Sequence, residues 1–157
     1  MASKISQLEL KPFEFHGYLG LRRVRSFGYR YDYARRKALA AEDIPEFLKS
    51  VRHKAAHFAG RDPDEFRQIL VTEYAPGAPI GWHKDKSEFG VIVGVSLLST
   101  CTLRLRKRRA TSGWDRASVS LEPRSAYIIS GESRSAWEHS IPPVQALRYS
   151  LTFRTLA

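Results

Sequence analysis

Two residues with metal-ligand chemistry lie close together near the middle of the chain, where a single lysine separates His83 from Asp85. On an extended backbone, residues two apart point to the same face, so the two side chains can converge on one point. An imidazole nitrogen and a carboxylate oxygen are two of the three ligands of a facial-triad non-haem Fe(II) site. A distant histidine would complete the set, and His139 fits. Two ordinary surface residues are the alternative.

A second pattern lies near the C-terminus, where polar and apolar residues alternate without a break. One face of the predicted strand carries Arg148, Ser150, Thr152 and Arg154. That face either lies in water, as on an ordinary half-buried strand, or points into a cavity that holds an anion. Arginine forms paired hydrogen bonds with carboxylates. Spacing alone leaves both interpretations open.

Together these motifs resemble those of a known family. His83-x-Asp85, the distal His139 and Arg148-x-Ser150-x-Thr152-Phe153-Arg154 are similar to the motifs of the AlkB family of Fe(II)- and 2-oxoglutarate-dependent dioxygenases. The resemblance runs from about Phe27 to the C-terminus. It implies that His83, Asp85 and His139 bind Fe(II), and that the enzyme oxidatively demethylates alkylated nucleobases in DNA or RNA.

The same resemblance implies a binding site for 2-oxoglutarate. Arg148 pairs with the far carboxylate of this cofactor, Arg154 lies near its metal-side carboxylate, and Tyr74 donates its hydroxyl group. The family usually has asparagine where this chain has Thr72 and Ser150. Because both replacements still form hydrogen bonds, we expect cofactor binding with altered geometry.

Aromatic residues interleaved with arginine precede the motifs. The alternating segment from Phe27 to Tyr33 predicts a strand. The resemblance implies that it belongs to a flap, within residues 13–36, that covers the substrate nucleotide. Packing of the segment on the core is the alternative. The candidate residues for substrate contact are Phe27, Tyr29, Tyr31, Trp82 and Arg106.

The charge of the chain points to a polyanionic partner. Basic residues outnumber acidic ones 26 to 16, giving a net charge of +10 over 157 residues. Such an excess is typical of nucleic-acid binding, with solubility as the plainer explanation. The basic run 106–109 ends a predicted strand, where it either contacts phosphates or protects a sheet edge. We expect single-stranded nucleic acid or a base turned out of the stack, because only such a base can reach the iron.

Many short predicted strands and one helix, over 44–58, indicate a mainly β fold. We expect a double-stranded β-helix, or jelly roll, with the N-terminal helix packed on one sheet and one domain over residues 1–157. No apolar run is long enough to span a membrane. The single cysteine, Cys101, agrees with a reducing compartment. We expect a cytoplasmic monomer, or a nuclear one in a eukaryote.

Two other functions fit part of these patterns. The same oxygenase chemistry could act on a protein side chain or a small molecule. Alternatively, the chain is a nucleic-acid-binding module with an inactive iron site. The complete set of motif residues argues against the second alternative, and the net charge favours a nucleic acid over other substrates.

Overall fold

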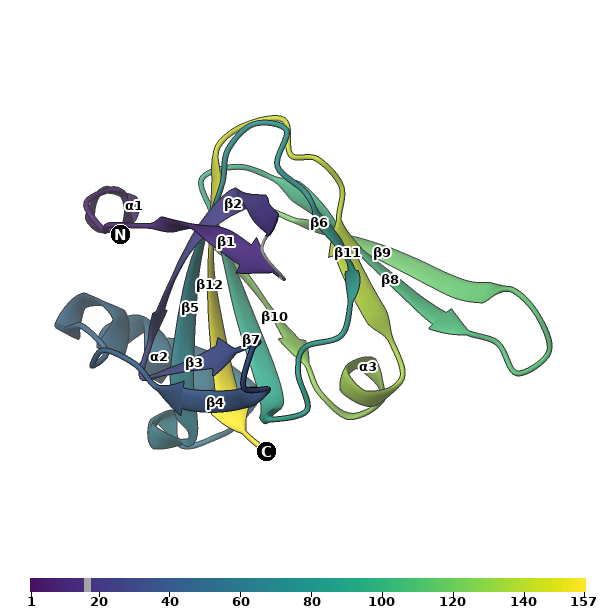
Figure 1. Ribbon diagram of the computed structural model, residues 1–157, viewed down its shortest axis with the longest axis horizontal. Coiled ribbons are helices and arrows are strands. Elements are labelled where there is room, and N and C mark those ends of the chain that lie inside the picture. The colour runs from purple at the N-terminus through teal and green to yellow at the C-terminus, as the bar shows by residue number, and fades with distance from the viewer. Residues whose placement is uncertain (16–17) are drawn as a thin grey trace.

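Two antiparallel β-sheets form the body of the protein (Figure 1). The computed structural model describes residues 1–15 and 18–157, so residues 16 and 17 of the expected flap lie outside the described residues. Within the described residues, the larger sheet has the order β1 (Lys11–Phe15), β2 (Tyr18–Phe27), β5 (Phe66–Tyr74), β12 (Arg148–Leu156), β7 (Phe89–Leu97), β10 (Ser125–Ile129). The smaller has the order β6 (Ile80–His83), β11 (Glu138–Ile141), β8 (Cys101–Arg108), β9 (Trp114–Leu121). This arrangement confirms the predicted jelly roll.

Shorter elements surround the two sheets. A two-stranded ribbon joins β3 (Tyr29–Asp32) to β4 (Lys37–Ala40). The helical elements are α1 (Ala2–Ser6), α2 (Glu46–Ala59), the 3₁₀ turn η1 (Pro63–Glu65) and α3 (Gly131–Ser135). None of the helices in the described part of the chain is long and apolar enough to cross a membrane.

The helix α2 covers one face of the larger sheet, as predicted. Its buried residues Leu48 and Ala55 belong to the same apolar cluster as Leu151 and Phe153 of β12, and all four are nearly inaccessible to solvent. The alternation of β12 therefore puts its apolar face against this helix and its polar face on the opposite side of the sheet. Burial of a leucine or phenylalanine side chain contributes about 1.5–3 kcal/mol, so this cluster anchors the strand that carries Arg148.

The N-terminal segment adds two strands to the larger sheet. β1 and β2 extend this sheet beyond β5, and β1 forms its edge. The strand predicted from Phe27 to Tyr33 breaks at Gly28, which has a φ of 78°. A Cβ atom there would lie 2.0 Å from the carbonyl oxygen of Arg67, so only glycine fits. The chain turns at this glycine and continues into β3.

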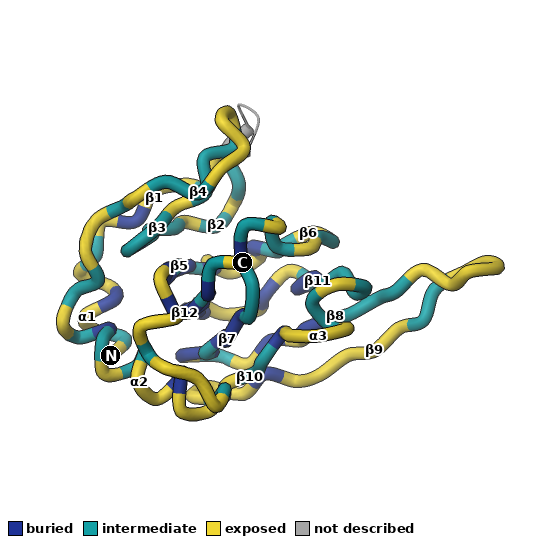
Figure 2. The backbone as a smooth tube through the Cα atoms, turned by 90° about the horizontal axis from the view of Figure 1, so that it is seen from below, coloured by how far each residue is buried: buried dark blue, intermediate teal, exposed yellow. Residues whose placement is uncertain are grey.

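The hairpin of β8 and β9 projects beyond the sandwich (Figure 1). Its far end is exposed, whereas the central strands of the larger sheet are buried (Figure 2). A second apolar cluster, which includes Leu103, Leu121 and Ile141, fixes the base of the smaller sheet. The hairpin therefore has a firmly packed base and a solvent-exposed tip.

Candidate active site

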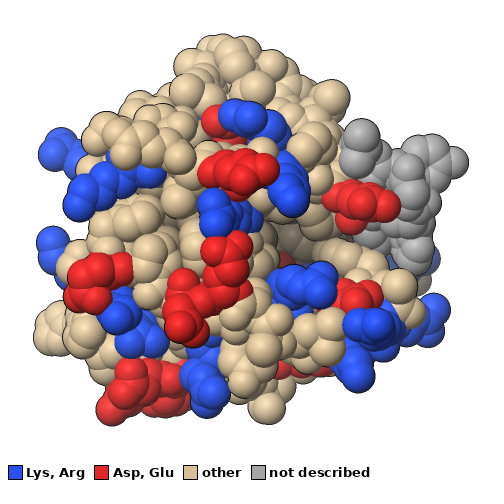
Figure 3. Space-filling view, turned by 60° about the vertical axis from the view of Figure 1, so that its left-hand side comes forward, with Lys and Arg blue, Asp and Glu red and all other residues tan. Residues whose placement is uncertain are grey.

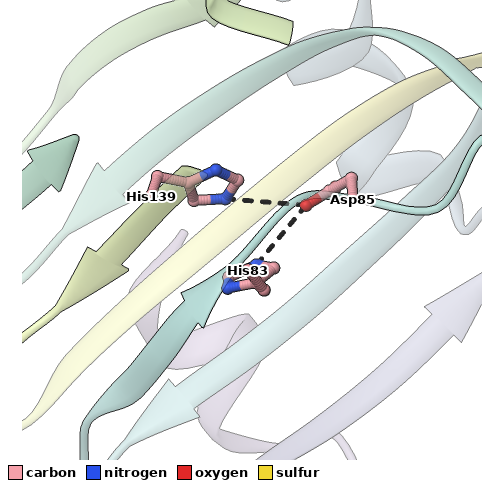
Figure 4. A group of neighbouring side chains, drawn as sticks. All are labelled: His83, Asp85 and His139. Atoms are coloured by element: carbon pink, nitrogen blue, oxygen red, sulfur yellow. Dashed lines mark ion pairs between the residues drawn. The ribbon is translucent and has the colours of Figure 1, made fainter. Parts of the chain in front are cut away.

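The ends of two neighbouring short strands bring the predicted metal ligands together. His83 ends β6 and lies opposite His139 of β11 in the sheet register, while Asp85 follows two residues after His83. The Nε2 atoms of both histidines lie 3.5 Å from Oδ1 of Asp85 (Figure 4). All three ligand atoms fall within 4.8 Å of one another, so the group could hold one metal ion. Two nitrogens and one carboxylate oxygen are the donor set of a facial-triad Fe(II) site.

Hydrogen bonding orients the first of these ligands. Nδ1 of His83 lies 2.8 Å from the carbonyl oxygen of Gly81. Because a carbonyl only accepts, Nδ1 carries the proton and donates it. The lone pair is then on Nε2, the nitrogen nearest Asp85. Metal-binding histidines commonly have such a bond, which fixes both the tautomer and the ring orientation.

The electrostatics of the group favour the protonation states that bind metals. Burial alone would raise the pKa of Asp85, but Arg154 and the two histidines outweigh it and hold the pKa well below its ordinary value. Arg154 donates through Nε to Oδ2 of Asp85 at 2.5 Å and through Nη1 to Gln68 at 2.9 Å. Burial, followed by repulsion from His83, lowers the pKa of His139 to about 4. At neutral pH the site therefore offers a carboxylate and a neutral imidazole.

Arg148 has unfilled hydrogen-bonding capacity deep in the sandwich. It is 1% exposed, and its Nε donates to Oγ of Ser96 at 2.9 Å. Both terminal nitrogens are buried, and no described residue accepts a hydrogen bond from them. Burying a cation without a hydrogen-bond acceptor lowers the stability of the folded protein by several kcal/mol, so we expect an anion to bind at this position. A carboxylate of 2-oxoglutarate matches the planar pair of donors.

Polar residues of β5 and β12 lie beside this arginine. Its guanidinium carbon lies 5.0 Å from the centre of the Tyr74 ring, and Tyr74 lies opposite Arg148 in the sheet register. Ser150, two residues after Arg148, lies opposite Thr72 in the same register. The two residues that replace the family's asparagines are therefore neighbours. Burial raises the pKa of Tyr74, whose phenol therefore remains a hydrogen-bond donor.

One cavity of about 1200 Å³ is lined by both histidines, Asp85, Arg154 and Tyr74. Arg148 does not itself line the cavity, but its guanidinium carbon lies 5.0 Å from the ring centre of Tyr74, which does. Single ligand sites usually occupy about 300–1,000 Å³, so the cavity has room for more than a small dicarboxylate. The polar face of β12 therefore faces this cavity rather than bulk water, which decides between the two interpretations of its alternation.

Aromatic side chains cover the cavity. We call Phe13, Tyr31 and Tyr33 the aromatic lid. Tyr31 and Tyr33 meet edge to face with ring centres 4.9 Å apart, and Phe13 and Tyr33 do so at 5.8 Å. Nζ of Lys86 lies within 5.6 Å of the centres of both tyrosine rings. Burial raises the pKa of Tyr33, and the nearby charges of Arg154 and Arg22 offset this only in part. Tyr33 lines the same cavity as the metal-ligand group.

The structure places only some of the residues predicted to contact substrate in the cavity. Tyr31 and Trp82 line the cavity. Phe27 is 3% exposed within the core, because the turn at Gly28 leaves it on the larger sheet. Tyr29 lies outside the cavity and accepts a hydrogen bond from Arg67 at 3.3 Å, and Arg106 lies on the outer face of the smaller sheet. Phe27 is therefore unavailable for stacking on a base.

Several cavity residues had escaped the sequence analysis. Tyr33 belonged to the predicted aromatic strand, but its parity changes at Gly28, so alternation could not single it out. Gln68 and Tyr127 also line the cavity. Gln68 follows Arg67 on β5 and Tyr127 lies between Ala126 and Ile128 on β10, so the neighbours of neither residue indicated a site. On β5, Gln68, Leu70 and Thr72 occupy alternate positions and so share one face of the strand. The polar side chains of Gln68 and Thr72 were the available signal that this face lines a cavity.

Comparison with known proteins agrees with this geometry. Residues 7–154 match the 2OG-Fe(II) oxygenase superfamily. The chain belongs to this superfamily. The name of this superfamily denotes Fe(II) and 2-oxoglutarate, and the group His83, Asp85 and His139 has the matching donor set.

The similar proteins come from diverse sources. The chain is 33% identical to the alpha-ketoglutarate-dependent dioxygenase AlkB of Salmonella typhimurium, over 73% of this chain and 56% of that protein. It is 28% identical to the alkylated DNA repair protein ALKBH8 homolog of Arabidopsis thaliana, over 79% and 42%. An uncharacterized protein of Acanthamoeba polyphaga mimivirus is 30% identical, over 72% and 59%. The chain thus spans roughly half the length of these relatives.

A solved structure supports the fold assignment. The protein superimposes on OsALKBH1 with a TM-score of 0.65 at 19% sequence identity, covering 98% of this chain and 87% of that one. At this identity the likeness concerns the fold.

Proposed function

We propose that this enzyme oxidatively removes alkyl groups from nucleobases of DNA or RNA. The observation that carries the proposal is the cavity, which has the group His83, Asp85 and His139 on its wall and the aromatic lid above it. A planar base fits between aromatic rings, and base–aromatic stacking contributes about 1–3 kcal/mol per base. Two similar proteins are named for AlkB-type activity or alkylated DNA repair, which supports the same substrate class.

In this proposal the residues have distinct roles around the cofactors. His83, Asp85 and His139 hold Fe(II), and Arg148 with Tyr74, Ser150 and Thr72 binds the far carboxylate of 2-oxoglutarate. With molecular oxygen as the oxidant, the bound cofactors would couple decarboxylation of 2-oxoglutarate to succinate and CO2 with hydroxylation of a carbon on the substrate, and an N-hydroxymethyl group would then leave as formaldehyde. Arg154 keeps Asp85 ionised and oriented through its Nε hydrogen bond, and it lies where it can also meet the metal-side carboxylate.

The remaining residues control access. The lid, part of the proposed flap 13–36, excludes water from the cavity and holds the base over the metal-ligand group. Tyr33, Tyr31 and Phe13 support one another by edge contacts, and Lys86 adds a cation above the two tyrosines. An alkyl group on a base held there would lie toward the group His83, Asp85 and His139, whose metal would supply the hydroxylation chemistry. We propose a monomer that acts on a single strand or an extruded base, in a reducing compartment such as the cytoplasm.

A substrate panel tests the proposal. Purified protein with Fe(II) and 2-oxoglutarate is offered methylated DNA and RNA oligonucleotides, methylated peptides and no substrate, while succinate and products are followed by mass spectrometry. We expect demethylated base and succinate in equal amounts with an oligonucleotide. The variant Tyr33→Ala should lower turnover on oligonucleotides without changing 2-oxoglutarate affinity. Demethylation or hydroxylation of a peptide, with none of any oligonucleotide, would instead favour a protein substrate.

A further inference from the structure

Arginine and tryptophan side chains alternate on the outer face of the smaller sheet. The guanidinium carbon of Arg104 lies 5.2 Å from the centre of the Trp82 ring, and that of Arg106 lies 4.4 Å from it. Arg106 also lies 4.2 Å from the Trp114 ring, and Arg108 lies 5.6 Å from that ring. The row thus runs from β6 onto the projecting hairpin of β8 and β9 (Figure 1).

Strand geometry divides the basic run 106–109 between two faces. Residues two apart on β8 share a face, so Arg106 and Arg108 point outward with Arg104, while Lys107 and Arg109 point to the other side. Lys107 pairs with Glu132 at 2.6 Å, and Arg109 pairs with Asp115 at 2.8 Å. The inner pair is thus neutralised within the protein.

The outer face, in contrast, carries excess positive charge. Arg106 pairs with Glu138 at 2.6 Å. Among the described residues, no carboxylate lies within ion-pair distance of Arg104, Arg108 or Arg116. Arg116 is also directly opposite Arg106 in the strand register. Like charges directly opposite each other destabilise a strand pair, and a bound polyanion would reduce this repulsion.

Other parts of the surface carry ion pairs. On the face shown in Figure 3, basic and acidic side chains are interspersed. Arg25 pairs with Glu42 at 2.8 Å, and Arg52 pairs with Asp64 at 3.1 Å. The outer face of the smaller sheet differs in that three of its arginines share one face without such a partner among the described residues.

We propose that the outer arginine face, formed by Arg104, Arg106, Arg108 and Arg116 with Trp82 and Trp114, binds the sugar-phosphate backbone of the strand that flanks the target base. This inference rests on the proposed function for the identity of the strand. Each tryptophan ring already has two guanidinium groups within 6 Å, so the rings serve to hold the arginines in place. A guanidinium held on a ring keeps its edge N–H groups for phosphate oxygens.

The position of this face suits such a role. Trp82 lines the cavity and directly precedes the metal-ligand candidate His83. A strand whose target base enters the cavity can therefore continue over Trp82 and along the hairpin. Because phosphates carry no base identity, the face would position the substrate without selecting a sequence.

Matched pairs of substitutions test the face. The outer double variant Arg108→Gln/Arg116→Gln and the inner double variant Lys107→Gln/Arg109→Gln remove the same charge from the same hairpin. Binding of the full chain to a fluorescent, unmodified single-stranded oligonucleotide is measured over a range of salt concentrations. Losing two single-strand phosphate contacts should flatten the plot of log K against log salt by about 1.4, at roughly 0.7 per contact. The inner variant should keep the wild-type slope.

A charge-neutral substitution separates ordered arginines from bulk charge. Trp114→Leu keeps every arginine but removes the ring that contacts Arg106 and Arg108. We expect binding to weaken by at least roughly 2- to 5-fold, the range for loss of one exposed cation–π contact. Thermal unfolding of each variant shows whether the hairpin still folds. Competition of poly-glutamate with the fluorescent oligonucleotide shows whether the face binds any polyanion or prefers a sugar-phosphate backbone.

Three results would overturn the proposal: an unchanged slope in the outer variant, an equal loss in the inner variant, or equal competition by poly-glutamate per charge. Turnover of a free methylated nucleoside by the wild-type protein is measured separately. Turnover together with any of those three results refutes the face alone. Loss of slope in the outer variant, without turnover of any methylated base, keeps the face and refutes the demethylase function.

Discussion

Replacing Arg148 with methionine should change the stability of the free and ligand-bound protein in opposite directions. In the free protein, the Arg148 guanidinium is buried, and its two terminal nitrogens have no acceptor among the described residues. Methionine has a similar volume and no charge, and replacing buried ionic groups by apolar ones often stabilises a protein by about 1–4 kcal/mol. For a domain of this size, 1 kcal/mol corresponds to about 2–4 °C in Tm. The free variant should therefore unfold at the wild-type temperature or several degrees higher.

The ligand-bound protein should show the reverse. At about 100 times its Kd, 2-oxoglutarate stabilises the wild-type fold by about 2.7 kcal/mol, or roughly 5–10 °C. Two charge-assisted hydrogen bonds from the guanidinium contribute about 1.5–3 kcal/mol each, so losing both weakens binding at least 100-fold. The thermal shift produced by 2-oxoglutarate with a redox-inert metal should then vanish in Arg148→Met. Arg148→Lys keeps the charge but loses the paired geometry, and should fall between the two.

A matched arginine provides the control for this experiment. Arg134 donates hydrogen bonds to the backbone carbonyls of Lys86, Phe89 and Gly90, at 2.7, 2.6 and 3.0 Å. Arg134→Met removes those donors, so the free protein should lose stability instead of gaining it. If Arg148→Met destabilises the free protein as Arg134→Met does, or if it retains the full ligand shift, Arg148 is a structural arginine and the reasoning fails.

Two further predictions follow from buried groups near the site. A Cβ atom on Gly94 would lie 2.1 Å from Cζ of Tyr127, so Gly94→Ala should lower the free energy of unfolding by about 1–3 kcal/mol. Adding Tyr127→Leu removes the clashing atoms and should restore much of the loss in urea unfolding; no recovery would contradict the clash. The pKa of His139 is about 4 in the folded protein, below its ordinary value, so the unfolded chain binds more protons between roughly pH 6.5 and 4. Metal-free protein should lose up to about 3 kcal/mol of stability as pH falls through that window, and His139→Gln should flatten this dependence; equal pH profiles would refute it.

The elements predicted well from sequence are those with long, regular patterns. β12 alternates over its whole length, and α2 carries an apolar stripe, so both were found nearly at their observed bounds. The pair His83 and Asp85 alone is a weak signal, and the ligand residues were predicted because the distal His139 and the C-terminal arginine motif complete a known family pattern. The jelly roll then brings His139 opposite His83 through a pairing between strands far apart in the chain.

What sequence could not supply is mostly contact between distant residues. β6 and β11 have four residues each, which is too short for a pattern to emerge. The change of face at Gly28 depends on the nearby carbonyl of Arg67 on another strand. Strand alternation divides the run 106–109 between two faces, but only the structure shows that Glu132 and Asp115 neutralise Lys107 and Arg109 on one of them.

Iron binding by single variants of the candidate ligands tests the central claim most directly. Anaerobically reconstituted wild-type protein should bind close to one Fe(II) per chain, and His83→Ala, Asp85→Ala and His139→Ala should each bind very little. The hydrogen-bonded His53 on the exposed face of α2 provides the control, since His53→Ala should keep the wild-type iron content. Circular dichroism checks that each variant is folded. Full iron content in the three ligand variants would contradict the proposed metal site, and with it the account of the cavity as an oxygenase active site.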